Sequence, residues 1–176
     1  MRTSVWITAV LVLLGSGVFP IETYSQSTGK ARSAYVPVTR FDPSRNAEQD
    51  IGLALTEAQQ SNRRVLLDVG GEWCIWCHRL DTLFVKHPGL AALLHDKFVV
   101  VKVNYSKENK NEQTLSRLPK IPGYPHLFVL SEDGMLLHSQ DTAELESGKG
   151  YDPEKVMAFV QAWGHPQGVR GAGTER

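Results

Sequence analysis

The order of segments along the sequence predicts an α/β sandwich in which helices flank a mixed β-sheet. Two observations carry this prediction. Segments with apolar residues at helical spacing alternate with short apolar runs that are rich in β-branched residues. The last two of these runs are separated by an Asp-Gly turn, which is typical of a hairpin. The alternation favours parallel strands and the hairpin adds an antiparallel pair, so the sheet is mixed.

The first helix is predicted over residues 44–60, because Asp42 and Pro43 form a helix start and apolar residues then recur at helical spacing. Residues 65–69 are predicted to be a buried strand, which a pair of glycines ends. The remaining elements are expected as helices over 74–84 and 88–94, a strand over 98–105, a helix over 111–118, strands over 126–130 and 135–138, and a helix from 153 to 163.

The sequence divides into four parts, which we predict to be an export signal (1–25), a linker (26–43), a folded domain (44–163) and a flexible tail (164–176). The signal is predicted because Arg2 precedes a 15-residue apolar run over 5–19, whereas a bilayer crossing needs ~20 residues. An uncleaved N-terminal anchor is the alternative. Either interpretation predicts a periplasmic or secreted protein, in surroundings where disulfides form.

The composition excludes several functional classes. Lysine and arginine total 19 and so do aspartate and glutamate, so the net charge is zero. This balance argues against nucleic-acid binding through bulk charge. An apolar fraction of 41% argues against general disorder. With only two cysteines, the chain has neither a disulfide-stapled framework nor a zinc site made of four cysteines.

The two cysteines, Cys74 and Cys77, carry the most specific functional signal. They follow a buried strand and a glycine turn, and Cys74 opens the next helix. The N-terminus of a helix stabilises an anion, which lowers the pKa of a cysteine from ~8.5 toward the range of ~3.5 to ~7.5. Cys74 is therefore expected to be a nucleophilic thiolate. Cys77 lies three residues later on the same face, from which it can attack a mixed disulfide formed at Cys74.

The segment D-V-G-G-E-W-C-I-W-C resembles the active-site region of the thioredoxin superfamily, in particular that of exported thioredoxin-like proteins and of the soluble domain of thiol:disulfide interchange proteins. V-K-V-N over 101–104 and I-P-G-Y-P-H over 121–126 extend the resemblance, which covers residues 44–163. It implies a thioredoxin-like three-layer sandwich. It also implies that the redox-active group is the Cys74–Cys77 disulfide and that no cofactor is needed.

The resemblance also implies roles for residues outside the cysteine pair. Asp68 corresponds to a buried aspartate that takes the proton of the second cysteine, and Lys102 to a lysine that approaches that aspartate. Pro125 corresponds to a cis-proline, which frames the partner's chain together with Tyr124. The alternatives are an Asp68 that only accepts turn hydrogen bonds, a Lys102 that faces solvent, and a trans Pro125 at a strand start.

The two tryptophans beside the cysteines are candidates for a partner-docking rim. Trp73 precedes Cys74, and packing within the domain is its alternative role. Trp76 lies between the cysteines and is expected to be exposed. The dipeptide Ile75-Trp76 differs from those of reducing thioredoxins and of isomerases, which leaves the direction of the redox reaction open.

These residues predict an exported thiol:disulfide oxidoreductase that acts on protein thiols and disulfides, as a monomer and with a redox partner protein. We expect a reductant or electron relay in preference to an oxidase. A binding module that retains the fold without turnover is the alternative from another functional class. The string C-I-W-C-H also fits a c-type haem carrier with His78 as axial ligand. A metal site made of Cys74, Cys77 and His78 is disfavoured because no fourth ligand is evident. A purely structural disulfide is also disfavoured, because a bridge across three residues constrains the unfolded chain little.

Overall fold

The computed structural model describes residues 35–164. The predicted export signal, the first part of the predicted linker and nearly all of the predicted tail lie outside these residues. The elements of the described part are, in order, α1 (Ala47–Ser61), β1 (Arg64–Gly70), α2 (Ile75–Lys86), α3 (Pro88–Lys97), β2 (Phe98–Asn104), α4 (Glu112–Leu115), β3 (His126–Leu130), β4 (Leu136–Asp141), the 3-10 helix η1 (Thr142–Leu145), β5 (Glu146–Ser147), β6 (Gly150–Tyr151) and α5 (Pro153–Trp163).

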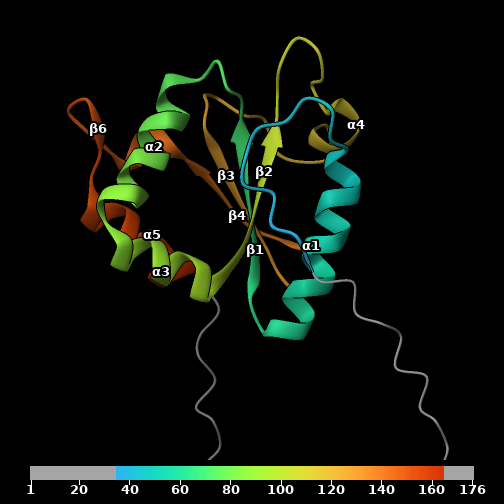
Figure 1. The fold of residues 1–176 in the computed structure, drawn as a ribbon, viewed down its shortest axis with the longest axis horizontal. Helices are drawn as coiled ribbons and strands as arrows, with labels where there is room; N and C mark the ends of the chain where they lie inside the picture. Colours follow the sequence, from blue (N-terminus) through green and yellow to red (C-terminus); the bar gives the residue numbers. More distant parts are fainter. Residues whose placement is uncertain (1–34, 165–176) are drawn as a thin grey trace, which may run out of the picture. The chain divides into compact units, whose positions relative to one another are not determined.

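The central sheet has the strand order β2-β1-β3-β4 (Figure 1). β1 pairs in parallel with β2 and antiparallel with β3, and β3 pairs antiparallel with β4. Helix α1 covers one face of this sheet, whereas α2, α3 and α5 cover the other. The predicted thioredoxin-like sandwich with a mixed sheet is thereby confirmed.

β1 is buried on both faces and shows why the sheet lies between two layers of helices. Val65, Leu67 and Val69 pack against the core that includes α1. Leu66 points to the opposite face and packs in the core formed with α2, α3 and α5. Because successive side chains of a strand alternate between faces, Asp68 and Gly70 also face α2. This alternation brings the buried carboxylate to the same layer as the cysteine helix.

The structure differs from the sequence prediction at several places. Helix α1 is capped by Asn46 and begins at Ala47, so Asp42 and Pro43 do not form its start. Residues 35–43, predicted to be part of a linker, pack on the domain: Val38 forms a parallel bridge with Val101 at the edge of β2, and Phe41 is 3% exposed. A single bridge is too short to leave a strand pattern in the sequence. The β5–β6 hairpin also has no counterpart in the prediction, because each of its strands has two residues. None of the helices within residues 35–164 combines the length and the hydropathy that a membrane crossing requires.

Candidate redox site

The cysteine pair lies at the junction between β1 and α2. Cys74 is the N-cap residue of α2, and it forms a disulfide with Cys77. The Sγ atom of Cys74 accepts a hydrogen bond from the backbone N–H of Cys77 at 3.1 Å. When the disulfide opens, the same N–H and the helix dipole stabilise a thiolate on Cys74. Cys74 is 4% exposed and Cys77 is fully buried, so Cys74 is the more exposed of the two cysteines.

Gly70 makes room for the buried sulfur. A Cβ atom built on Gly70 would collide with the Sγ atom of Cys77 and would lie 3.2 Å from the ring of Phe41. The Cys77 sulfur therefore packs directly on the backbone of β1. Asp68, two residues earlier, points to the same face of the strand.

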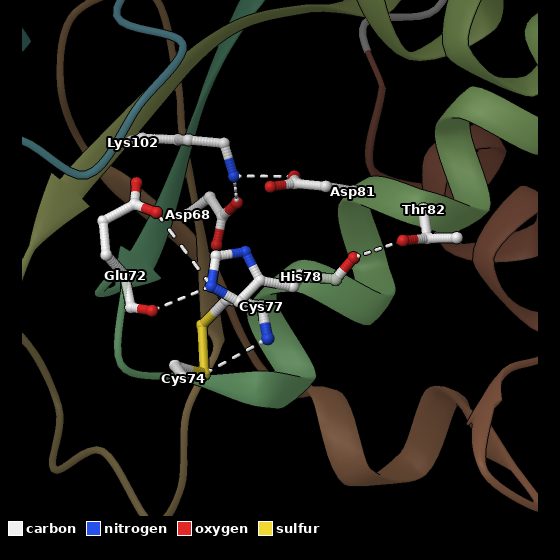
Figure 2. Close-up of polar contacts among 8 residues, drawn as sticks. All are labelled: Asp68, Glu72, Cys74, Cys77, His78, Asp81, Thr82 and Lys102. Carbon is white, nitrogen blue, oxygen red and sulfur yellow. Dashed lines mark hydrogen bonds and ion pairs between the residues drawn. A yellow bond between two sulfur atoms is a disulfide. The ribbon is translucent and has the colours of Figure 1, made fainter.

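Asp68 and Lys102 are paired because their strands are in register. The two residues are direct partners in the parallel β1–β2 ladder, and Lys102 Nζ donates to Asp68 Oδ2 at 2.9 Å. The same Nζ donates to Asp81 Oδ1 of α2 at 2.7 Å. Figure 2 shows Lys102 lying between the two carboxylates. The alternative of a solvent-facing Lys102 is wrong, since its side chain is only 10% exposed.

The three charges of this cluster differ in their access to water. Asp68 is 5% exposed, and its Oδ1 accepts no hydrogen bond from any residue that the structure describes. Burial raises the pKa of Asp68, and Lys102 opposes this shift only in part. Burial lowers the pKa of Lys102, but Asp68 and Asp81 outweigh it and the pKa is raised. The Asp81 side chain is 45% exposed, so Lys102 connects a buried carboxylate to one at the surface.

The sequence prediction assigns no individual role to three residues of the site. Asp81 lies four residues after Cys77, on the same face of α2, and this spacing is its only signal. Phe41 packs against both cysteines, and its ring lies 4.2 Å from Lys102 Nζ. Ile75 is 59% exposed beside Cys74, whereas the sequence marks it only as part of the dipeptide between the cysteines.

An aromatic cluster borders the cysteines on the side of the loop 121–126. Trp73 is 59% exposed, and its indole N–H donates to the carbonyl oxygen of Tyr105 at 2.7 Å. The Tyr124 ring stacks on Tyr105 at 4.9 Å and meets Trp73 edge-on at 5.6 Å. Burial, with a smaller effect of Tyr105, raises the pKa of Tyr124 to about 12. Tyr124 also packs against the cysteine cluster, so the loop and the cysteines are adjacent.

Trp76 does not belong to an exposed rim, contrary to the expectation. Its ring is partly buried, where it meets Tyr151 edge-on at 5.7 Å, and the guanidinium of Arg79 lies 4.3 Å from its centre. No sequence pattern indicates Tyr151, because the β5–β6 hairpin brings it to α2 from 75 positions further along the chain. The exposed apolar side chains next to Cys74 are therefore Trp73 and Ile75.

The remaining predicted residues are Pro125 and His78. The Tyr124–Pro125 peptide bond is cis, and the carbonyl oxygen of Pro125 accepts a hydrogen bond from Thr142 Oγ1 at 2.6 Å. The His78 ring folds back so that its Nε2 lies 2.8 Å from the carbonyl oxygen of Glu72. Within residues 35–164, no group of three or more His, Cys, Asp or Glu side chains is arranged to hold a metal ion.

The fold and the cysteine pair together are those of the thiol:disulfide oxidoreductases built on the thioredoxin fold. Residues 46–131 match the model of the thioredoxin-like family. This match continues more than fifty residues beyond C-I-W-C-H, which favours a thioredoxin site over a haem attachment site.

Two curated relatives carry related names. The thiol:disulfide interchange protein DsbD of Pseudomonas sp. (strain JR1 / K1) is 26% identical over 146 residues, which are 82% of this chain and 23% of the relative. The thiol:disulfide interchange protein DsbE of Pseudomonas aeruginosa is 31% identical over 103 residues, 58% of this chain and 49% of the relative. The chain thus spans about a quarter of the length of the first relative and about half of the second.

Two solved structures support the fold. The disulphide isomerase from Xylella fastidiosa Temecula1 superposes with a TM-score of 0.61 at 21% identity, over 72% of this chain and 97% of that one. The oxidised C-terminal domain of DsbD from Neisseria meningitidis gives a TM-score of 0.50 at 15% identity, over 66% of this chain and 94% of that one. At such identities the similarity establishes the fold.

Proposed function

We propose that this chain exchanges disulfides with partner proteins outside the cytoplasm and that it acts as a reductant or electron relay. The observation that carries the proposal is the position of Cys74, whose sulfur caps α2 and which is the more exposed of the two cysteines. The apolar run over residues 5–19 supports export. The names of the relatives support interchange of thiols and disulfides.

In the reducing direction, the Cys74 thiolate attacks one sulfur of a partner disulfide. A mixed disulfide forms, and the second partner sulfur leaves as a thiolate and takes a proton from solvent. Cys77 then loses its proton to Asp68, and its thiolate attacks the Cys74 sulfur. This attack forms the Cys74–Cys77 disulfide and releases the first partner sulfur as a thiolate. Two electrons pass to the partner, and a dithiol protein restores the reduced pair by the reverse sequence.

Asp68 is suited to the role of proton acceptor because burial raises its pKa, which makes its carboxylate a stronger base than that of an exposed aspartate. Lys102 and Asp81 connect this carboxylate to the surface.

Partner proteins are proposed to dock over the exposed side chains that flank Cys74. Trp73 and Ile75 are each 59% exposed, and exposed apolar side chains that gather at one place indicate an interaction site. Next to them lies a hollow of about 510 Å³ whose lining includes Phe41, Trp73 and Tyr105. An extended partner segment that presents a cysteine to Cys74 would cover these residues.

Two measurements test the proposal. The chain should reduce the disulfides of insulin with dithiothreitol as the electron source, and Cys74→Ser should abolish this turnover. The equilibrium reduction potential of the pair against glutathione should lie on the reducing side. A wild-type protein without turnover would favour a binding module, and a strongly oxidising potential would reverse the proposed direction.

A further inference from the structure

The loop that carries Pro125 is held by a side chain where the backbone ladder stops. In the β3–β4 pair, His126 is the partner of Asp141, so the next residues in this register are Pro125 and Thr142. A proline has no N–H, and the ladder cannot continue through it. The Thr142 hydroxyl takes over and donates to the Pro125 carbonyl oxygen at 2.6 Å. Thr142 is 3% exposed, so this bond is protected from water.

Tyr151 connects this bond to the cysteine helix. The β5–β6 hairpin, which turns at Gly148 with a φ of +59°, returns the chain toward α2. From there the Tyr151 hydroxyl donates to Thr142 Oγ1 at 3.3 Å, and the Tyr151 ring meets Trp76 edge-on at 5.7 Å. The Tyr151 side chain thus touches both Trp76, which lies between the two cysteines, and Thr142, which holds the proline loop.

We propose that Tyr151 and Thr142 are positioning residues, which fix the Tyr124–Pro125 loop relative to the cysteine helix and so set how well a protein partner is engaged. This inference rests on the proposed function, because it concerns the partner of the same exchange reaction. Neither side chain is assigned a part in the transfer of electrons or protons. A small disulfide or dithiol needs the Cys74 sulfur alone, whereas a polypeptide must contact the cysteine helix and the loop together. The two kinds of substrate therefore respond differently when this connection is lost.

The hydroxyl of Tyr151 is a persistent donor. Tyr151 is 7% exposed, and burial raises its pKa to about 12, against a smaller opposing effect of the Thr142 hydrogen bond. The hydroxyl therefore stays protonated over the pH range in which thiol exchange proceeds. The chain of donors, from Tyr151 through Thr142 to the Pro125 carbonyl oxygen, keeps one direction throughout that range.

The test compares a protein substrate with a small one. Tyr151→Phe removes the hydroxyl and keeps the ring against Trp76. Insulin reduction should become slower by roughly three- to tenfold, the equivalent of one buried hydrogen bond, mainly through a higher KM. The rate at which dithiothreitol reduces the Cys74–Cys77 disulfide, followed by thiol alkylation, should stay the same. Thr142→Val removes the hydroxyl and should slow insulin reduction at least as much. Thr142→Ser keeps the hydroxyl and should leave insulin reduction at the wild-type rate.

The matched control is Tyr35→Phe. The Tyr35 ring packs against the other core, which includes α1, so removal of its hydroxyl should change neither rate. The double variant with Tyr151→Phe and Thr142→Val should cost less than the product of the two single effects, because both substitutions break one chain of bonds.

The results of these experiments test the positioning role separately from the proposed function. Unchanged insulin reduction by Tyr151→Phe, or an equal loss with insulin and with dithiothreitol, overturns the positioning role. The Tyr151→Phe and Thr142→Ser comparisons decide the matter even where Thr142→Val fails to fold. If the wild-type disulfide is reduced by dithiothreitol but insulin is never turned over, the proposed function fails. That result differs from the selective loss expected of the variants.

Discussion

Asp68→Asn is the substitution that most directly tests the proposed chemistry, because it keeps the shape of the side chain and removes the proton acceptor. We expect the second step of exchange, in which Cys77 attacks the mixed disulfide, to slow by about 10²-fold at pH 7, the lower end of the range for a lost general base. The difference should shrink above about pH 9, where a cysteine with an ordinary pKa of ~8.5 loses its proton to solvent unaided.

The same substitution has an effect on stability whose sign follows from the raised pKa of Asp68. The native carboxyl binds its proton more tightly than the unfolded one, so stability is lost as the pH rises from the ordinary value of ~3.9 through the native pKa. The unpaired Oδ1 atom represents a cost of about 1–3 kcal/mol at neutral pH. The asparagine oxygen can still accept from Lys102, and Asp81 still balances the lysine charge. We therefore expect a free energy of unfolding equal to the wild type or up to about 2 kcal/mol higher at pH 7, and no difference below about pH 4.

The assay mixes the reduced protein with excess glutathione disulfide and follows the singly glutathionylated protein by quenching and mass spectrometry. Urea unfolding at several pH values gives the stability. Asp81→Asn is the matched control: it removes a charge from the same lysine, but at a side chain that is 45% exposed, and should alter the rate by less than about fivefold. A rate deficit of Asp68→Asn that is the same at pH 7 and pH 9.5, or no deficit at all, would refute the assignment of Asp68 as proton acceptor.

Three further substitutions test separate parts of the site and of the fold. Cys77→Ala should trap mixed disulfides with partners on non-reducing gels, whereas Cys74→Ala should trap few; equal trapping contradicts the order of attack. Gly70→Ala should lower the free energy of unfolding of the oxidised protein by about 1–3 kcal/mol, because the new Cβ meets Cys77 Sγ. The control Gly89→Ala, whose Cβ has no neighbour within 4 Å among the described residues, should cost nothing, and an equal loss in both would remove the steric argument. Burial lowers the pKa of His126; His138 adds to this shift and Asp141 opposes it. Below the ordinary pKa of ~6.5, the unfolded state therefore binds more protons than the native state, and the free energy of unfolding falls as the pH drops. His126→Gln should flatten this slope between about pH 6.5 and 5 in urea titrations, whatever its effect at pH 7, and an unchanged slope would show that His126 does not cause it.

Much of the fold was predictable because its strongest elements are locally encoded. The apolar runs of β1 and β2 are continuous. The dipeptide Asp152-Pro153 marks the start of α5, where the Asp152 side chain accepts hydrogen bonds from the N–H groups of Glu154 and Lys155. The packing of residues 35–43 could not be predicted in the same way. It depends on one bridge, Val38 to Val101, and on the burial of Phe41. Both are long-range contacts that leave no periodic pattern.

The residues of the candidate site also differ in whether a local sequence pattern indicates them. Cys74, Cys77 and Asp68 lie within ten residues of one another, so one strand and one helix start relate them and the sequence reveals them. Lys102 lies beside Asp68 because β1 and β2 pair in that register. Only the resemblance to a known family indicated this neighbour, since residue patterns alone do not show strand register. Asp81 and Tyr151 depend on side-chain directions and on a hairpin of two-residue strands. Neither feature has a local signal.

The Asp68–Lys102–Asp81 cluster is the part of the domain in which stability and proposed function are opposed. A buried carboxylate oxygen without a hydrogen bond costs free energy, and an amide or an apolar side chain at position 68 would avoid that cost. Lys102 donates a hydrogen bond to only one of the two Asp68 oxygens, because its second short hydrogen bond goes to Asp81. No group within residues 35–164 donates to the other Asp68 oxygen. A purely structural ion pair would be expected to satisfy both oxygens of the carboxylate. The proposed function accounts for this oxygen, because protonation of Asp68 would remove the buried charge when Cys77 gives up its hydrogen.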